Sequence, residues 1–344
     1  MDFKKQNKWV IAAISIGAIA LIAAIFVYFT FFAAEFQTDK KAYVYIDRDD
    51  TADSIMVKVE QAGMPRGMKT FRWLMNNLDD AKSIHTGRYA IKPGDGNYPV
   101  FRRLTRGQQA PLEFSINDVR TSGQLAKKIG NQLMIDSAEV ATRLNDSTFC
   151  SKLGFKKENI VSIFIPNTYE LYWNISTADL FKRMKKEYNL FWTSDRLAKA
   201  KSIGYTPAEV TTIASIVEEE TNNNEEKPMV AGLYINRLHK GMKLQADPTV
   251  KFAVQDFTIK RVTGTHLRST SPYNTYKFEG LPPGPIRIPS IKGIDAVLNY
   301  TKHNFVYMCA KEDFSGTHNF AATWEEHQAN ARKYQEELNK RKIF

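Results

Sequence analysis

The longest apolar run in the chain lies close to its N-terminus. Residues 9–34 (WVIAAISIGAIALIAAIFVYFTFFAA) contain no charged side chain. A helix needs about 20 apolar residues to cross a bilayer, whereas the core of a cleaved signal peptide has roughly 7–15. No polar cleavage region follows, because the aromatic end of the run leads directly into Ala33, Ala34 and Glu35. The pattern therefore predicts one uncleaved transmembrane helix over 9–34; a cleaved signal is the competing interpretation, and a buried core helix is unexpected at this length.

After the run the pattern changes to short alternating and helical segments. Residues 36–42 are predicted to form a short polar tether, and residues 43–109 a small α+β unit. The elements expected in that unit are a strand YVYI (43–46), a helix capped by Thr51 that continues to Gly63, a helical stretch over about 68–78, a return strand GRYAI (87–91), a turn at 93–96 and a short helix YPVFRRLTRG (98–107). We expect these elements to close into a separate small domain.

The larger remainder, residues 110–344, mixes a few strands with more numerous helices. The expected elements are a strand in PLEFSI (111–116), a helix after the Thr121-x-x-Gln124 capping pattern, mostly helix over 137–205 interrupted by FIPNTYELYW (164–173), a strand in NFVYMCA (304–310) and a long polar helix capped at Thr323 to Glu326. The predicted fold class is therefore α+β, with a single N-terminal transmembrane helix, a small α+β domain and a larger mixed α+β domain.

The distribution of charge predicts an orientation for the chain. Lys4, Lys5 and Lys8 precede the apolar run, and positive flanking residues stay on the cytoplasmic side. Residues 1–8 are thus expected to form a cytoplasmic tail, and everything after about residue 35 to lie outside the membrane. The formal net charge of +11 does not indicate a nucleic-acid partner in that location; anionic lipid or an acidic wall polymer fits better.

Cysteine and histidine give no sign of a metal or redox site. Cys150 and Cys309 are the only cysteines and form no C-x-x-C pair, and the six histidines show no H-E-x-x-H spacing. We expect no metal ion and no cofactor. The two cysteines could pair in an oxidising compartment, and their spacing leaves that open.

The stretch ASIVEEETNNNEEKP (214–228) ends a helix with three consecutive carboxylates, Glu218, Glu219 and Glu220. The helix is expected to begin at a capping box, with Thr206 as the N-cap and proline next. Counting 100° per residue from Val210 puts Glu219 opposite the buried stripe, facing water, and Glu218 and Glu220 at its two borders.

A carboxyl at such a border can be partly desolvated and still reach a ligand, which suits a general acid. One turn before Glu218 stands the small Ala214, and one turn before Glu220 the larger Ile216, so the spacing favours Glu218. A solvated helix end with no chemistry remains the alternative.

Four further segments gather polar and aromatic side chains on loops and helix ends. They are INRL (235–238) with Asn236 and Arg237, LQADPTV (244–250) with Gln245 and Asp247, SPYNTY (271–276) with Tyr273 and Asn274, and the rigid loop GLPPGPIRIPS (280–290). Asp247-Pro248 is expected as an N-cap followed by proline, so helix capping alone explains Asp247. Together these side chains suit sugar rings and acyl groups, although each has a packing or turn explanation.

VEEET (217–221), INRL, LQADPTV, SPYNTY and GLPPGPI, in this order and spacing, resemble the YceG-like family. The resemblance covers most of the chain after the apolar run, and implies a LysM-like domain over 43–109 and a YceG-like catalytic domain over 110–344. One departure is visible: Val161-Ser162 and Asn167 stand where the family tends to have Glu-Gly and Asp. That departure puts in doubt a role for a carboxylate there.

The resemblance implies a lytic transglycosylase that cleaves the β-1,4 bond between N-acetylmuramic acid and N-acetylglucosamine in nascent glycan strands, leaving a 1,6-anhydro end. It places the family's essential glutamate at Glu218. The muramic acid's own C6 hydroxyl attacks, so one carboxyl can donate a proton and later accept one. The remaining candidates are assigned to supporting roles: Glu220 as an electrostatic neighbour, and Asn236, Arg237, Gln245, Asp247, Tyr273 and Asn274 as groups that hold or position sugar and N-acetyl groups.

The expected partners are peptidoglycan strands, still lipid-linked, the membrane through residues 9–34, and proteins of cell-wall synthesis. Two alternatives stay open. One is a muramidase-type hydrolase that uses Glu218 with a second carboxylate such as Asp247. The other is a non-catalytic, membrane-anchored scaffold whose LysM-like domain binds the wall.

Overall fold

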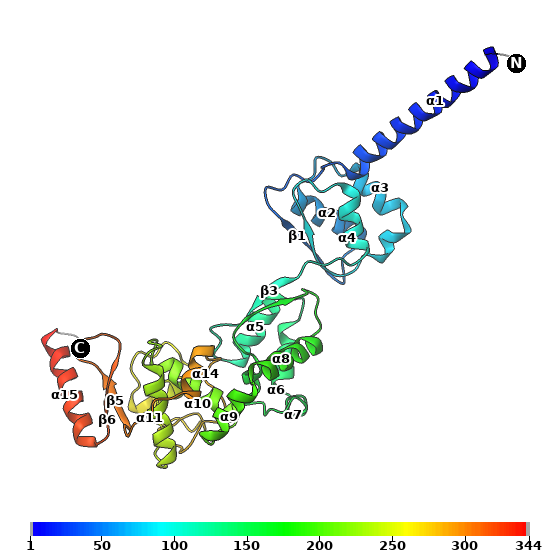
Figure 1. The fold of residues 1–344 in the computed structure, drawn as a ribbon. Helices are drawn as coiled ribbons and strands as arrows, with labels where there is room; N and C mark the ends of the chain where they lie inside the picture. Colours follow the sequence, from blue (N-terminus) through cyan, green and yellow to red (C-terminus); the bar gives the residue numbers. More distant parts are fainter. Residues whose placement is uncertain (1–2, 342–344) are drawn as a thin grey trace. The chain divides into compact units, whose positions relative to one another are not determined.

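The computed structural model describes residues 3–341, and the chain divides into two compact units. The first comprises Met1–Glu113 with Glu170–Ile175, and the second Phe114–Tyr169 with Ser176–Phe344. Figure 1 colours the chain from blue to red along the sequence. Both units combine helices with short strands, so the fold is mixed α+β.

The first unit begins with a long apolar helix. Helix α1 (Phe3–Val27) continues into a π-helical turn, η1 (Tyr28–Phe32), and the chain becomes extended at Ala33. The segment Lys8–Phe32 is long and apolar enough to cross a membrane, and none of its most apolar window is buried inside the protein. The helix predicted over 9–34 is therefore present and ends two residues early.

The rest of the first unit is a small α+β fold. Its expected elements are present as β1 (Ala42–Ile46), α2 (Ala52–Gly63), α3 (Lys69–Asn77), β2 (Gly87–Ile91) and α4 (Asn97–Thr105). A 3-10 turn that the sequence did not predict, η2 (Asp79–Ser83), follows α3. Strands β1 and β2 pair antiparallel, with Val44 opposite Tyr89. Thr51 caps α2 in a capping box with Ser54. Phe71, Leu74 and Phe101 fill a core beneath the two strands.

The polar tether predicted over 36–42 is wrong at its start. Phe36 is only 2% exposed and forms a β-bridge with Pro65. Its ring lies so close to Gly63 that a Cβ at that position would clash with it. Glu35 Oε1 also accepts a hydrogen bond of 2.6 Å from the Gly67 backbone. Burial of the one large apolar side chain in this polar stretch is enough to hold the start of the segment against the core.

The second unit is larger and mostly helical. Its elements are α5 (Ser122–Gln132), α6 (Ser137–Asn145), α7 (Ser147–Lys152), the 3-10 turn η3 (Ile160–Ile163), α8 (Thr177–Phe191), α9 (Ser194–Ser202), α10 (Pro207–Glu220), α11 (Lys227–His239), α12 (Asp247–Val254), α13 (Gly264–Leu267), α14 (Ile291–Leu298), β5 (Tyr307–Ala310), β6 (His318–Ala321) and α15 (Trp324–Lys340). Two further strands, β3 (Leu112–Ser115) and β4 (Thr168–Leu171), lie where the chain passes between the units. Strands β5 and β6 pair antiparallel, and α15, red in Figure 1, packs against both.

Helix α10 is the centre of the second unit. It packs against α11, α12 and α14, and all eight residues from Val210 to Val217 are buried. The single buried stripe and the solvated opposite face that the sequence predicted are therefore wrong for this helix. Because α10 is covered on every side, its three terminal glutamates each meet a different neighbour.

Candidate active site

Helix α10 begins as the sequence predicted. Thr206 Oγ1 accepts a hydrogen bond from the Glu209 backbone, and Glu209 Oε2 accepts one of 2.8 Å from the Thr206 backbone. Pro207 occupies the first helical position. In the middle of the helix, Ser215 Oγ accepts a hydrogen bond of 3.0 Å from the Ile286 backbone. This bond fixes the rigid 280–290 loop against α10.

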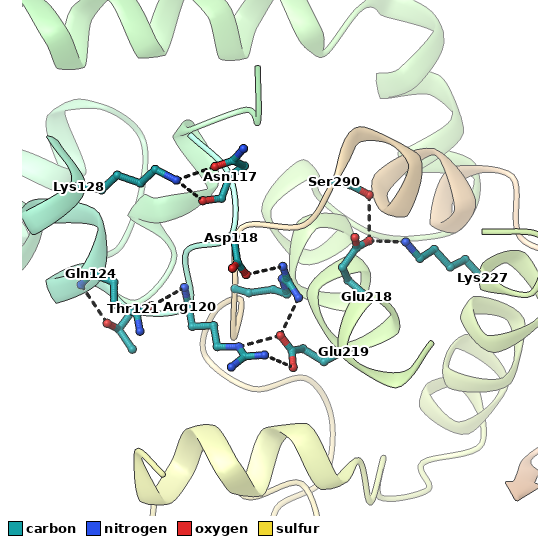
Figure 2. A network of polar contacts seen from close by, with 11 residues as sticks. Asn117, Asp118, Arg120, Thr121, Gln124, Lys128, Glu218, Glu219, Lys227 and Ser290 are labelled. Carbon is teal, nitrogen blue, oxygen red and sulfur yellow. Dashed lines mark hydrogen bonds and ion pairs between the residues drawn. The ribbon is translucent and has the colours of Figure 1, made fainter. Parts of the chain in front are cut away.

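Glu218 lies in a buried ion pair. Its Oε2 accepts hydrogen bonds of 2.9 Å from Lys227 Nζ and of 2.9 Å from Ser290 Oγ, at the start of α14 (Figure 2). The Lys227 side chain is 5% exposed and that of Glu218 15%. Gly293 closes the same site, since a Cβ there would lie 2.5 Å from Glu218 Oε2. Glu218 thus fastens α10 to the helices beside it.

Glu219 does not face open water, contrary to the helical-phase prediction. Its carboxylate accepts hydrogen bonds from Arg120 Nε at 2.9 Å and Nη2 at 3.1 Å, and from Arg287 Nη1 at 2.8 Å (Figure 2). Arg287 also pairs with Asp118 at 3.2 Å. The side chain of Glu219 is only 16% exposed. Two guanidinium groups therefore hold the last turn of α10 to the segment that precedes α5.

Glu220 faces a different environment, a cavity of about 250 Å³. Its Oε1 accepts a hydrogen bond of 2.7 Å from the Tyr234 hydroxyl, on α11. Burial raises the pKa of Glu220 to about 7. The Tyr234 hydrogen bond and the nearby His318 oppose that rise, and Asp247 adds to it. A carboxyl that titrates near neutrality beside a cavity can give and take a proton at physiological pH.

The cavity brings together polar side chains from five parts of the second unit. Besides Glu220 and Tyr234, they are Arg237 on α11, Gln245 and Asp247 at the start of α12, Tyr276 and His318. Leu233, Leu244, Met308, Cys309 and Ala310 complete the wall. Of the expected site residues, the fold therefore gathers Glu220, Arg237, Gln245 and Asp247.

Asp247 is not a helix cap. It is the first residue of α12, Ala246 is the N-cap, and no side chain caps this helix. The Asp247 Oδ1 instead accepts a hydrogen bond of 2.6 Å from the Tyr276 hydroxyl. Gln245 has a left-handed backbone with φ of 50°, which turns the chain at the cavity edge. The N-cap prediction failed because the residue before Asp247 already has the extended conformation that a cap requires.

Arg237 and Asn236 serve chiefly as anchors. Arg237 donates from Nε to the Val306 carbonyl at 2.6 Å and from Nη1 to the Leu244 carbonyl at 2.8 Å. It thereby ties two cavity walls together. Asn236 donates to the carbonyls of His303, at 2.7 Å, and Phe305, at 3.0 Å. Asn236 is not among the residues that line the cavity.

Tyr273 and Asn274 also lie outside the cavity wall. Asn274 is fully buried, and its Nδ2 donates hydrogen bonds of 2.9 Å to the carbonyls of Leu267 and Ser269. Tyr273 packs against Phe252 at 4.6 Å between ring centroids. The SPYNTY segment contributes a different residue to the cavity, Tyr276, and its asparagine and first tyrosine shape the turn that presents it.

Three polar residues of the cavity, Tyr234, Tyr276 and His318, were not among the site residues predicted from the sequence. Tyr234 and Tyr276 lie in or next to quoted segments, so a prediction that the segments converge could have included them. His318 had no such signal in the sequence, because only the β5–β6 pairing brings it to the cavity.

Among residues 3–341, no group of three or more His, Cys, Asp and Glu is arranged to hold a metal ion. Cys150 and Cys309 are both free, the first buried and the second at the cavity.

The sequence matches the profile of the YceG-like family over residues 44–333. This chain belongs to the YceG-like family. As a YceG-like protein it is 26% identical over 332 residues to a Bacillus subtilis (strain 168) protein named endolytic murein transglycosylase, with 91% of each chain covered. It is also 26% identical over 332 residues to a protein of the same name from Streptococcus pneumoniae (strain ATCC BAA-255 / R6), covering 86% of this chain and 58% of that one.

The fold of this YceG-like chain is also that of a solved structure. A yceG-like protein of Listeria monocytogenes, 24% identical in sequence, superposes with a TM-score of 0.57. The match covers 85% of this chain and 99% of that one. The mixed α+β architecture described above is thus a YceG-like fold.

Proposed function

We propose that this chain is a lytic transglycosylase of peptidoglycan. It would cleave the β-1,4 bond between N-acetylmuramic acid and N-acetylglucosamine and leave a 1,6-anhydro end. The observation that carries the proposal is Glu220, a carboxyl at a polar cavity whose pKa burial raises to about 7. The names of the Bacillus and Streptococcus relatives, endolytic murein transglycosylase, support the substrate class.

Glu220 replaces Glu218 as the proposed acid and base. Glu218 is engaged by Lys227 and Ser290 and is not among the residues that line the cavity. Glu220 lines the same cavity as residues of LQADPTV (244–250) and SPYNTY (271–276), the segments expected to position the substrate. The small Ala214 one turn before Glu218 does not by itself leave space for a ligand, because Lys227, Ser290 and Gly293 from neighbouring segments lie against Glu218.

In the proposed reaction, protonated Glu220 gives its proton to the glycosidic oxygen as the bond from C1 breaks. The C6 hydroxyl of the same muramic acid attacks C1 and passes its proton to the Glu220 carboxylate, so a 1,6-anhydro ring forms and no water is consumed. The intramolecular nucleophile contributes through its high effective molarity. Gln245, Asp247 and Tyr276 would position the sugar, and Arg237 would hold the two walls at a fixed separation.

A muramidase-type hydrolysis is the second candidate, and one observation favours it. Asp247 lines the same cavity as Glu220, and a pair of carboxylates is what a hydrolase needs to protonate the leaving group and to activate water. The hydrogen bond from Tyr276 to Asp247 argues for a positioning role instead, since it occupies one of the two carboxylate oxygens.

The rest of the chain would bring the cavity to its substrate. We propose that residues 9–34 cross the cell membrane with the N-terminus in the cytoplasm, so that the catalytic unit meets nascent, lipid-linked strands outside. The 43–109 unit would act as a LysM-like glycan-binding domain. Proteins of cell-wall synthesis are the expected neighbours. A scaffold without catalysis is the remaining alternative.

Purified full-length protein in detergent, incubated with glycan strands, tests these proposals by mass spectrometry of the products. Wild type should release fragments one water lighter than hydrolytic fragments, Glu220→Gln should release none, and Glu218→Gln should keep the same product at a reduced yield. Fully hydrated reducing ends would favour the muramidase. Unchanged cleavage by Glu220→Gln, or binding without cleavage by wild type, would remove the proposed catalysis.

A further inference from the structure

We propose that His318 is a second catalytic residue of this cavity, which accepts the proton of the attacking C6 hydroxyl at Nε2 while Glu226 holds its ring. This inference rests on the proposed function and adds a base to it. It replaces a scheme in which one carboxyl does both proton transfers with one in which two residues share them.

The geometry starts with the pairing of two short strands. His318 is the first residue of β6 and lies opposite Ala310 of β5, and both residues line the cavity that contains Glu220. The His318 side chain is 17% exposed. A histidine at the end of a strand that borders this cavity is well placed to contact a ligand.

Glu226 fixes His318 by two hydrogen bonds. Its Oε2 lies 2.9 Å from His318 Nδ1, and its Oε1 accepts a hydrogen bond of 2.6 Å from the His318 backbone. Glu226 immediately precedes α11 and is 8% exposed. A carboxylate that is nearly buried needs such partners, because an unpaired buried charge is costly. Both ring and backbone of His318 are therefore oriented by one side chain.

The Glu226 contact determines which ring nitrogen can act. An ionised carboxylate only accepts hydrogen bonds, so Nδ1 carries the hydrogen in this contact. In the neutral imidazole, Nε2 is then the acceptor and is available to a ligand. The same arrangement of carboxylate and imidazole orients the general base in serine hydrolases. Imidazole is also the side chain whose ordinary pKa is closest to neutral, which suits a base at physiological pH.

The proposed step balances with these two residues. Glu220 gives its proton to the glycosidic oxygen, the bond from C1 to that oxygen breaks, the bond from C1 to O6 forms, and the O6 proton passes to His318 Nε2. The step leaves an ionised Glu220 and a protonated His318, which attract each other. The proton then returns from His318 to Glu220 through solvent, so the enzyme is regenerated without a co-reactant.

Two other groups could compete for this role. Asp247 has one oxygen occupied by the Tyr276 hydroxyl, and a carboxylate is a weaker base than an imidazole near neutral pH. Glu220 could take the O6 proton only after it has given up its own, which makes the two transfers sequential. His318 interacts with two carboxyl groups from other elements, Glu226 immediately before α11 and Glu220 at the end of α10.

The test uses full-length protein in detergent and soluble, uncrosslinked glycan strands. His318→Gln and His318→Ala should each lower kcat by about 100-fold, in the range typical of a lost general base, with KM within roughly twofold of wild type. Added imidazole should restore part of the His318→Ala rate. Glu226→Gln should lower kcat by about 10-fold, and Glu226→Asp should recover part of it, because it keeps the charge. His239→Gln, an exposed histidine outside the cavity, is the matched control and should match wild type.

A wild-type kcat in His318→Gln, or a raised KM with kcat unchanged, would overturn the proposal. Thermal unfolding checks that each variant is folded; if His318→Gln is not, Glu226→Gln, which leaves the imidazole in place, decides the question by the same criteria. The proposed function fails separately, if Glu220→Gln stays active or wild type gives no anhydro product.

Discussion

The hydroxyl of Tyr234 donates a hydrogen bond of 2.7 Å to Glu220 Oε1, which joins α11 to the last residue of α10. Burial raises the pKa of Glu220 to about 7, and this hydrogen bond opposes the rise because it favours the ionised carboxylate. The pair therefore sets the pH at which the carboxyl can act as an acid.

Tyr234→Phe should move the alkaline limb of the pH–rate profile upward. Without the hydroxyl the carboxylate loses a stabilising partner, so the pKa of Glu220 rises and the protonated form persists to higher pH. A hydrogen bond to a charged group contributes about 1.5–3 kcal/mol, which corresponds to a shift of roughly one to two pH units. Steady-state rates measured across pH 5–9 check this; an unchanged or acid-shifted limb would contradict it.

Glu220→Gln should change stability in a pH-dependent way. Because the folded-state pKa of about 7 lies above the usual 4.5, the contribution of Glu220 to stability is complete below about pH 4.5. It is lost as the pH rises through 7. Glutamine cannot ionise, so the unfolding free energy of the variant should rise relative to that of wild type as the pH increases. The rise should be on the order of 3 kcal/mol at most.

Urea unfolding of both proteins at pH 4 and pH 8 measures that difference. Glu225→Gln is the control, because Glu225 is exposed. The difference in unfolding free energy between this variant and wild type should be the same at pH 4 and pH 8. An equal difference at pH 4 and pH 8 for Glu220→Gln would show that the carboxyl is not desolvated as described.

Glu218→Gln should destabilise the protein by about 3–5 kcal/mol, because it leaves the buried Lys227 ammonium without its counter-ion. The double variant Glu218→Gln with Lys227→Met should recover most of that loss. Chemical unfolding at neutral pH checks both. If the double variant is no more stable than Glu218→Gln, the ion pair is not the reason for the loss.

Gly293→Ala should lower stability by about 1–3 kcal/mol, the usual cost of overpacking a close contact. Its Cβ would lie 2.5 Å from Glu218 Oε2, so the ion pair would have to shift. Gly264→Ala is the matched control, because nothing lies within 4 Å of a Cβ there. The comparison uses thermal unfolding, and equal midpoints for the two variants would contradict the close contact.

The elements of this fold follow from local signals where those signals are strong. The helix caps at Thr51, Thr121, Thr206 and Thr323 were predicted from a few residues each, and all four residues cap helices. Their hydrogen bonds lie within four residues of chain, so no tertiary information is needed. The same holds for strands β1 and β2, whose alternation or composition marks them directly.

The site could be predicted only in part. Gln245, Asp247 and Glu220 were in the expected set because they lie in segments with a distinctive pattern, and they do line one cavity. The choice between Glu218 and Glu220 could not come from helical phase, since Lys227 and Tyr234 lie on a second helix. Likewise His318 depends on the register of β5 and β6, which a pattern of single residues does not specify.

The rate at which Cys309 is alkylated can show whether the cavity is occupied. Cys309 lies on the cavity wall, and the other thiol, Cys150, is sealed in the interior. Burial raises the pKa of Cys309, so the reactive thiolate is scarce at neutral pH and slow alkylation is expected. A glycan fragment that fills the cavity should slow it further, so occupancy could be followed on the unmodified chain without an engineered label.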